Sequence, residues 1–274
     1  MALLINGLSG FSIPALDRGL QYGDGLFETI AVAAGEPCLW HRHRQRLERG
    51  CRRLKIEIPD GDILLEEVYR EIDRRPRGVI KIVLTRGSGG RGYLPPQIQT
   101  PTRLVYFSEW PEYPAGLTRS GVRVRLCETR LGQNAALAGL KSLNRLEQIL
   151  ARAEWVDRDI SEGLMRDTEG YLVEGTMSNL FVVDEAQLRT PDLGVCGVAG
   201  VMREVVMDQA ARLGIPLSIE KLTMRDLASA NGLFLSNSLI GIWPVREFDG
   251  EKYDPGRVPS ALVDAVMDHG FRFG

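Results

Sequence analysis

Lysine is scarce in this 274-residue chain, and this limits any chemistry that needs an amine. Only five of the 34 basic residues are lysines: Lys55, Lys81, Lys141, Lys221 and Lys252. Lys141 follows the apolar stretch 135–140, and an amine in apolar surroundings has a lowered pKa that makes it nucleophilic. The alternative is an ammonium that reaches solvent along its apolar stem. Lys141 is therefore the first candidate for amine chemistry.

Three other segments could contact an anion or a cationic nitrogen. Glu174 lies between apolar residues and a turn of small residues, so it is either solvated or a buried partner for a cation. Residues 197–204 form a glycine-rich turn that leads into a helix, where free N–H groups and the helix dipole favour an anion. The basic segment 41–46 is expected to be mostly solvated, with one arginine that could point inward and hold a phosphate.

Residues 87–92 have the spacing GxGxxG, which matches the dinucleotide-binding fingerprint. That fingerprint must open a helix, and the prolines at 95 and 96 oppose a helix here. We therefore interpret the segment as a flexible glycine loop. Arg86 or Arg91 in such a loop could bind a carboxylate with both arms of its guanidinium.

Each of these signals also fits an ordinary structural role. Together they are the parts that a pyridoxal-phosphate enzyme needs: a Schiff-base lysine, an acid for the pyridine nitrogen, a helix start for an anion, and an arginine. The combination favours an enzyme with that cofactor over a binding module.

Composition excludes several other classes of protein. The chain has 34 basic and 36 acidic residues, a net charge of −2, which argues against a nucleic-acid binder. Its four cysteines are far apart and its histidines number three, so neither a disulfide framework nor a metal site is expected. The first ten residues do not form a signal peptide, and the uncharged stretch 227–245 predicts strand-turn-strand rather than a membrane span. We expect a cytoplasmic protein that binds no membrane.

Hydrophobic periodicity predicts mixed secondary structure. The expected helices cover 41–54, 62–74, 142–158, 201–213 and 260–269. The expected strands cover 26–34, 79–85, 104–108, 122–126, 163–165, 171–173, 179–183, 216–221 and 232–235. In the helix 142–158 the apolar stripe that should face inward comprises Leu143, Leu146, Ile149, Leu150 and Ala153.

The order of these elements does not alternate regularly, which favours an α+β fold. Two prolines and a glycine after position 110 mark 111–116 as the linker. We therefore expect a smaller N-terminal α/β domain over 1–110 and a larger C-terminal cofactor-binding domain over 117–274.

Seven segments resemble the fold-type IV pyridoxal-phosphate enzymes, the family that includes branched-chain and D-amino-acid aminotransferases. They recur in family order along nearly the whole chain: residues 17–29 (DRGLQYGDGLFET), 43–47 (HRQRL), 86–93 (RGSGGRGY), 141–148 (KSLNRLEQ), 174–181 (EGTMSNLF), 200–203 (GVMR) and 235–239 (LSNSL).

The resemblance implies a two-domain α+β subunit that works as a homodimer and binds pyridoxal 5'-phosphate at the domain interface. It makes Lys141 the catalytic Schiff-base lysine and Glu174 the partner of the pyridine nitrogen. It assigns the phosphate to Arg46, with the backbone amides of Val201 and Met202 and with Asn237 and Ser238 nearby. It places Arg91 at the substrate carboxylate, and Phe27 and Tyr93 line the substrate site.

Within the family, the segments are most similar to members that eliminate pyruvate from 4-amino-4-deoxychorismate and release 4-aminobenzoate, a folate precursor. Lys141 would then act as nucleophile and as general base.

One alternative is an aminotransferase that acts on D-amino acids or branched-chain amino acids. Branched-chain enzymes carry tyrosine where this chain has Leu146, and D-amino-acid enzymes carry Tyr and His in place of Phe27 and Tyr93. The other alternative is a non-catalytic binding protein on the same fold. Loss of Lys141 or Glu174 would indicate it, and both residues are present.

Overall fold

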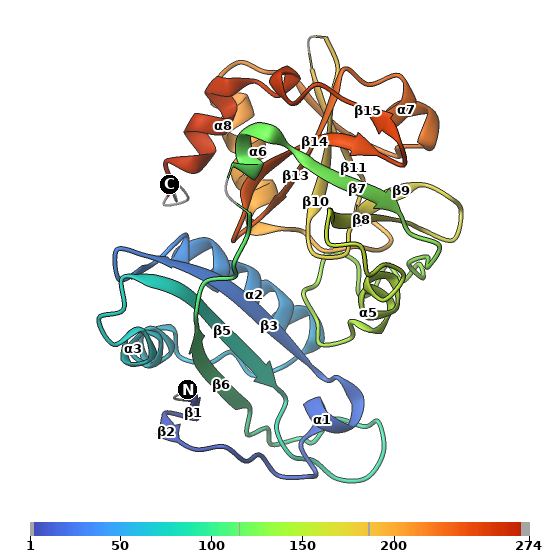
Figure 1. Cartoon of the computed structure of the whole chain (residues 1–274). Coiled ribbons are helices and arrows are strands. Elements are labelled where there is room, and N and C mark those ends of the chain that lie inside the picture. Colours follow the sequence, from blue (N-terminus) through green and yellow to red (C-terminus); the bar gives the residue numbers. More distant parts are fainter. Residues whose placement is uncertain (1–2, 115, 186, 270–274) are drawn as a thin grey trace. The chain divides into compact units, whose positions relative to one another are not determined.

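The computed structural model describes residues 3–114, 116–185 and 187–269, which mix helices with strands as an α+β protein does. The chain divides into two compact units, and Figure 1 shows the elements of each. Unit 1 holds Met1–Pro111 and Lys141–Asn144, and unit 2 holds Glu112–Leu140 and Arg145–Gly274. The domain limits expected from the sequence stay a prediction, and residue 115 of the expected linker lies outside the described residues.

Unit 1 is an antiparallel sheet with helices packed on it. The strands follow the spatial order β2-β1-β6-β5-β3-β4. Their bounds are Leu3–Ile5 (β1), Leu8–Ser9 (β2), Gly25–Ala33 (β3), Glu36–Pro37 (β4), Arg77–Thr85 (β5) and Thr102–Ser108 (β6). The helices are Arg18–Tyr22 (α1), Trp40–Leu54 (α2) and Gly61–Ile72 (α3).

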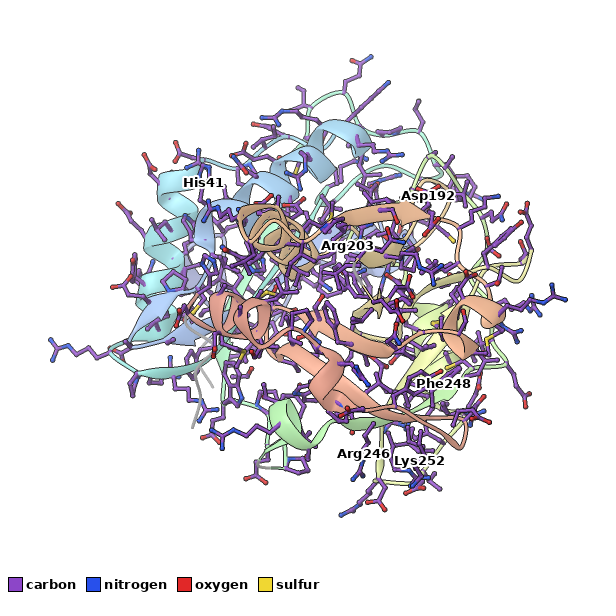
Figure 2. The ribbon with its side chains drawn as sticks, turned by 90° about the horizontal axis from the view of Figure 1, so that it is seen from above. His41, Asp192, Arg203, Arg246, Phe248 and Lys252 are labelled. Carbon is purple, nitrogen blue, oxygen red and sulfur yellow. The ribbon has the colours of Figure 1, made fainter. Side chains whose placement is uncertain are left out.

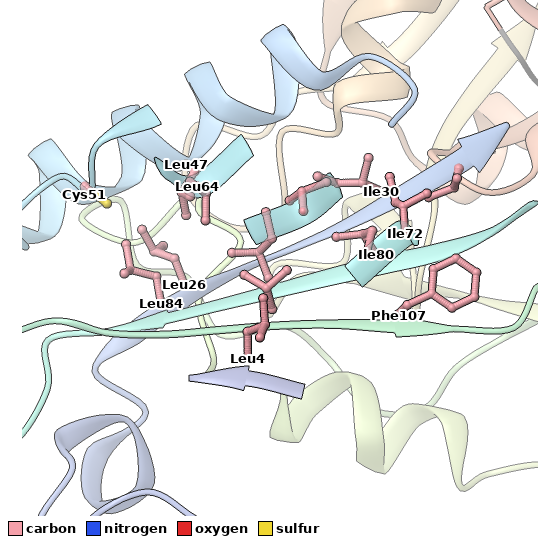
Figure 3. Packing of buried hydrophobic residues seen from close by; sticks show 14 of the residues in the cluster. Leu4, Leu26, Ile30, Leu47, Cys51, Leu64, Ile72, Ile80, Leu84 and Phe107 are labelled. Atoms are coloured by element: carbon pink, nitrogen blue, oxygen red, sulfur yellow. The ribbon is translucent and has the colours of Figure 1, made fainter. Parts of the chain in front are cut away.

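The core of unit 1 lies between the sheet and helices α2 and α3. Figure 3 shows side chains of β3 and β5, such as Ile30 and Ile80, packed with Leu47 of α2 and Leu64 of α3. Burying one such side chain contributes about 1.5–3 kcal/mol. Because side chains alternate along a strand, the even-numbered residues of β3 face α2 and the odd-numbered residues face away.

Unit 2 is a second sheet that closes on itself. Its spatial order is β12-β11-β10-β13-β14-β7-β8-β9, and β9 also pairs with β10. The strand bounds are Val122–Leu126 (β7), Ile160–Arg166 (β8), Leu172–Gly175 (β9), Asn179–Val183 (β10), Leu188–Pro191 (β11), Leu217–Glu220 (β12), Gly232–Asn237 (β13), Gly241–Phe248 (β14) and Glu251–Lys252 (β15).

The closing contact of this ring is the pairing of Glu174 in β9 with Asn179 in β10. The helices of unit 2 are Leu117–Ser120 (α4), Leu146–Arg152 (α5), Val201–Arg212 (α6), Met224–Ala228 (α7), Ser260–Met267 (α8) and the 3-10 turn Pro255–Arg257. The sheet core is apolar and includes Leu164, Leu180, Leu235 and Trp243. A rigid, closed sheet therefore carries the Glu174–Asn179 turn.

The helix expected over 142–158 is wrong at both ends. Helix α5 covers only Leu146–Arg152, because the residues before it extend along β3 and Ser142 pairs with Leu26. The expected inward stripe is also wrong: Leu146, Ile149 and Leu150 are 61–73% exposed in the single chain. Apolar periodicity correctly predicted a helix here, but it did not predict that the apolar side of that helix is exposed in the single chain.

The structure confirms two other predictions of local structure. The stretch 227–245 contains β13 and β14 joined by a turn, as predicted. Within the described ranges, no helix combines the length and the apolar character that crossing a membrane requires. Residues 87–92 form a loop that opens no helix, which confirms the rejection of the dinucleotide fingerprint.

Candidate functional site

Lys141 is held at the open edge of strand β3. The N–H of Phe27 donates to the Lys141 carbonyl at 3.0 Å, and the N–H of Leu143 donates to the Gly25 carbonyl at 3.0 Å. Ser142 faces Leu26 between these two bonds. The segment from 141 to 143 thus forms a short antiparallel addition to the sheet, which fixes the backbone of the lysine.

The Lys141 side chain lies over the ring of Phe27. Its Nζ is 4.3 Å from the ring centroid, and Nζ of Lys81 in β5 is 4.9 Å from the same centroid. Burial lowers the pKa of Lys81. Phe27 is odd-numbered in β3, so both amines belong to the sheet face that points away from α2. Sequence analysis made Lys141 the first candidate for amine chemistry, yet Lys81 shares the aromatic surface on which Lys141 lies.

Arg46 lies on helix α2 and reaches a buried acid on the other face of β3. Its Nε donates to Oε1 of Glu28 at 2.8 Å and its Nη2 donates to Oε2 at 2.5 Å. Nδ1 of His43, one turn earlier on α2, is 2.7 Å from Oε2 of the same carboxylate. Glu28 and His43 are each 1% exposed and Arg46 is 8% exposed. We call this set the Glu28 cluster.

Electrostatics fix the charges within the Glu28 cluster. Burial alone would raise the pKa of Glu28, but the charge of Arg46 and the bonds from Arg46 and His43 lower it to about 2. Burial lowers the pKa of His43, against the opposing pull of Glu28. His43 is therefore a neutral ring that donates from Nδ1 to an ionised carboxylate. Its Nε2 is buried and has no hydrogen-bond partner among the described residues.

Arg91 and Tyr93 lie on the loop between β5 and β6. Both are exposed, Tyr93 by 84%, and no hydrogen bond or ion pair joins either one to Lys141 in the described ranges. Arg18 anchors the loop, because it donates to the carbonyls of Gly92 at 2.9 Å and Tyr93 at 3.1 Å. These bonds hold the backbone of the loop. The substrate contacts of Arg91 and Tyr93 stay predictions.

Glu174 is the buried acid of unit 2. It is 5% exposed and lies within β9, so of the two alternatives that the sequence left open it is the buried carboxylate. The N–H of Val198 donates to its Oε2 at 2.7 Å, and Nε2 of Gln148 is 3.5 Å from its Oε1. Oε1 of Gln148 is itself buried and accepts no hydrogen bond from the part of the chain that the structure describes. Arg145 also interacts electrostatically with the Glu174 carboxylate.

The turn before helix α6 is built close to Glu174. Gly197 has φ +85°, and a Cβ there would lie 2.7 Å from Cγ1 of Val173 and 3.4 Å from Oε2 of Glu174. Gly200 is the N-cap residue directly before α6, and no side chain of the described residues caps that end of the helix. The first-turn amides of a helix have no partner within the helix, so those of Val201 and Met202 suit an anion, and their phosphate contact stays a prediction.

A buried arginine lies at this end of α6. Figure 2 marks Arg203 in the first turn of the helix and Asp192 after β11. Arg203 donates from Nη2 to the Pro191 carbonyl at 3.0 Å, and burial lowers its pKa although nearby acids, Asp192 first, oppose the shift. Sequence analysis did not single out Arg203.

Asn237 organises the turn between β13 and β14. Its Oδ1 accepts from the N–H groups of Leu239 at 2.8 Å and Ile240 at 3.0 Å, and its Nδ2 donates to the Met177 carbonyl at 3.1 Å. Asn237 thus ties this turn to the turn that follows Glu174. Phosphate contacts of Asn237 and its neighbour Ser238 stay predictions.

The predicted residues therefore form two groups. Unit 1 brings together Lys141 and Phe27, with Arg46 across the same strand, and unit 2 brings together Glu174 and the start of α6. Glu28 was missed even though it lies inside a quoted segment. An acid among the inward-facing residues of an expected strand was the signal that could have identified it.

Comparisons with known proteins identify the family and the fold of the chain. The family model for amino-transferase class IV matches residues 25–248. The crystal structure of 4-amino-4-deoxychorismate lyase from Pseudomonas aeruginosa superimposes with a TM-score of 0.93 at 47% identity, covering 97% of this chain and 98% of that one.

Two further relatives span most of the chain. Aminodeoxychorismate lyase from Vibrio harveyi is 36% identical over 241 residues, which are 88% of this chain and 89% of that protein. A branched-chain-amino-acid aminotransferase from Pseudomonas aeruginosa is 26% identical over 266 residues, which are 92% of this chain and 86% of that protein.

Proposed function

The chain belongs to the amino-transferase class IV family, and we propose that it eliminates pyruvate from 4-amino-4-deoxychorismate to give 4-aminobenzoate, with pyridoxal 5'-phosphate as cofactor. The observation that carries the proposal is its likeness, over nearly the whole chain, to two lyases of that name. An aminotransferase is also among the relatives, so the reaction is the point that an experiment must decide.

The described residues fit the cofactor. A pyridine nitrogen that stays protonated needs a buried carboxylate, and Glu174 provides one whose position is fixed by the Val198 amide. A phosphate needs N–H donors, which the uncapped start of α6 and the guanidinium of Arg46 supply. The orphaned Oε1 of Gln148 beside Glu174 is a polar atom that a ligand could satisfy.

Pyridoxal phosphate, when bound, supplies an electron sink for the negative charge that develops on the substrate carbon. The chain must supply the base. We propose that Lys141 would hold the cofactor through its amine, and that the same amine, when free, would remove the ring proton at the carbon that bears nitrogen. The pairing with the edge of β3 holds the Lys141 backbone. The amine can therefore change position only by rotation of the lysine side chain.

The substrate has carboxylates, and unit 1 offers cations for them. Lys81 lies on the Phe27 surface with Lys141, where its charge could bind a carboxylate without taking the role of the base. Arg91 on the exposed loop is the second cation that we propose for this purpose. Phe27 and Tyr93 would then contact the substrate ring.

We also propose that the enzyme is a cytoplasmic homodimer. All four cysteines are free thiols, which suits a reducing compartment. Both units expose large apolar side chains, among them Phe11, Leu94 and Ile98 of unit 1 and Ile149 of unit 2, at 61–88% exposure. Sedimentation of the wild type as a dimer and of Ile149→Asp as a weakened dimer would support this, and a monomeric wild type would contradict it.

The reaction is tested by coupling the purified holoenzyme to a chorismate-aminating enzyme and measuring 4-aminobenzoate. We expect product with the wild type and none with Lys141→Ala. Incubation with D-alanine or a branched-chain amino acid plus 2-oxoglutarate is the competing assay. Transamination without 4-aminobenzoate would make the chain an aminotransferase, and absence of both activities would favour a binding protein.

A further inference from the structure

The Glu28 cluster is unusual because nothing in the proposed reaction requires a buried acid at that place. Glu28 is even-numbered in β3, so it projects among the apolar residues that pack against α2. An acid is costly in such a position unless it is paired and hydrogen-bonded. Glu28 meets this condition with Arg46 and His43, whose side chains both come from α2.

The geometry of the pair is specific to a guanidinium. Glu28 receives Nε–H and one Nη2–H of Arg46 on its two oxygens, which uses two of the five N–H donors of an arginine. This fork fixes the plane in which the whole guanidinium lies. The carboxylate therefore also sets the direction in which the other N–H groups of Arg46 point.

His43 fixes Glu28 in turn. Its ring is 1% exposed, and Nδ1 donates to the oxygen that Arg46 Nη2 also contacts. His43 and Arg46 are three residues apart on α2, so both side chains leave the same side of the helix. The carboxylate is therefore held at both oxygens by one rigid helix.

From this we propose that Glu28 and His43 are positioning residues for the cofactor phosphate: they orient the Arg46 guanidinium so that its remaining donors face that phosphate. The inference rests on the proposed function, since it takes pyridoxal phosphate as the ligand. It adds that phosphate affinity depends on two side chains that need not touch the ligand.

The variant that tests this is Glu28→Gln. Glutamine has nearly the same shape, but it presents one acceptor oxygen and one NH2 group, so it cannot accept the fork. Apo-protein of the wild type and of the variant is titrated with pyridoxal phosphate and, separately, with pyridoxal, which has the aldehyde and lacks the phosphate. Binding is followed by absorbance and needs no turnover.

We expect Glu28→Gln to weaken pyridoxal phosphate binding roughly tenfold to hundredfold, the range for one hydrogen bond to a charged group. Pyridoxal affinity should be unchanged. Equal affinity of variant and wild type for pyridoxal phosphate would overturn the inference, and so would an equal loss for both ligands. A wild type that binds neither ligand would instead refute the proposed cofactor.

Unit 1 contains a matched control. Glu67 of α3 is 2% exposed and forms its own fork with Arg103, with Nε at 3.2 Å and Nη2 at 2.7 Å. Glu67→Gln breaks a fork on an equally buried acid, here with a half-buried arginine, outside the proposed site. It should lose thermal stability like Glu28→Gln and keep the wild-type affinity for pyridoxal phosphate. A loss of affinity in Glu67→Gln would show that general destabilisation explains the effect.

Two further variants keep the inference testable if Glu28→Gln does not fold. Asparagine at position 43 can still donate to Glu28, whereas leucine cannot, so His43→Asn should retain more phosphate-dependent affinity than His43→Leu. Arg46→Lys keeps the charge and loses the fork, and it should show the same selective loss. Equal affinities of His43→Asn, His43→Leu and the wild type would remove His43 from the proposal, and wild-type affinity in Arg46→Lys would remove the fork.

Discussion

The two units hold the charged groups of the candidate site by different means. In unit 1 side chains hold one another: Glu28 orients Arg46, and the carboxylate is itself held by His43. In unit 2 the backbone does this work, since the Val198 amide holds Glu174 and the start of α6 presents its N–H groups. The first arrangement depends on three particular side chains, and the second depends on the absence of side chains at Gly197 and Gly200.

This difference predicts which substitutions matter in each unit. In unit 1, removing one side chain of the Glu28 cluster should weaken ligand binding, because it leaves the other members as buried charges without that partner. Adding a methyl group should damage the site in unit 2, because the Cβ would occupy space that the turn needs. The predictions below test these two sensitivities.

The largest effect is expected from Arg46→Ala. It removes the phosphate donor that we propose and leaves the Glu28 carboxylate buried without its main partner, a loss of about 3–5 kcal/mol in unfolding free energy. Cofactor dissociation constants should rise roughly tenfold to hundredfold. Thermal unfolding and absorbance titration measure the two effects. Arg103→Ala, which leaves Glu67 unpaired, should lower stability without changing cofactor affinity.

A smaller effect is expected from Gly197→Ala in unit 2. Its φ of +85° costs a non-glycine residue about 1–3 kcal/mol, and the new Cβ would lie 2.8 Å from Cδ2 of Leu193. The Val198 amide should shift away from Glu174 and weaken cofactor binding. The matched control is Gly214→Ala, with φ +69° and open space around its Cβ. Equal cofactor affinities in the two variants would contradict the role given to this turn.

The smallest effect that we expect is a loss of folding stability in unit 1 at acidic pH. Burial lowers the pKa of His43 below its usual 6.5, and the net pKa of Glu28 falls from 4.5 to about 2 although burial opposes this. The unfolded chain therefore binds more protons than the folded chain, first at His43 below about pH 6.5 and then at Glu28, so stability falls as pH falls. Each proton contributes a slope of at most about 1.4 kcal/mol per pH unit.

Unit 2 responds to acid in the opposite direction through Glu162. Burial raises the pKa of this carboxyl although Thr176 and Ser178 donate to it, so its contribution to stability is lost as pH rises and is restored in acid. Hydrogen exchange of α2 and β8 at pH 7 and pH 5, corrected for intrinsic rates, should show protection lost more in α2. His43→Asn should reduce that difference. Equal losses in α2 and β8 would contradict this assignment.

The sequence predicted the residue types of the site better than their surroundings. Lys141 and Glu174 could be selected because lysines are few and because short motifs carry them. Glu28 could not be paired with Arg46 from periodicity alone, because the contact depends on how α2 crosses β3. Asn237 shows the same limit: its amide is used inside a turn that only the fold creates.

The errors in the fold have a similar cause. The residues before α5 had helical periodicity, yet they pair with β3, and a long-range strand edge overrode the local preference. The exposed stripe at Leu146 and Ile149 shows that periodicity identifies an apolar face without identifying what covers it. Strand existence was easier to predict, because alternation in segments such as 26–34 follows directly from burial on one side.

The central claim is that Lys141, and not its neighbour on the Phe27 ring, carries the cofactor. The direct test treats the holoenzyme with borohydride, digests it and identifies the pyridoxyl-modified lysine by mass spectrometry. We predict modification at Lys141 and none at Lys81. Modification at Lys81, or an unmodified protein that nevertheless releases 4-aminobenzoate, would contradict the account.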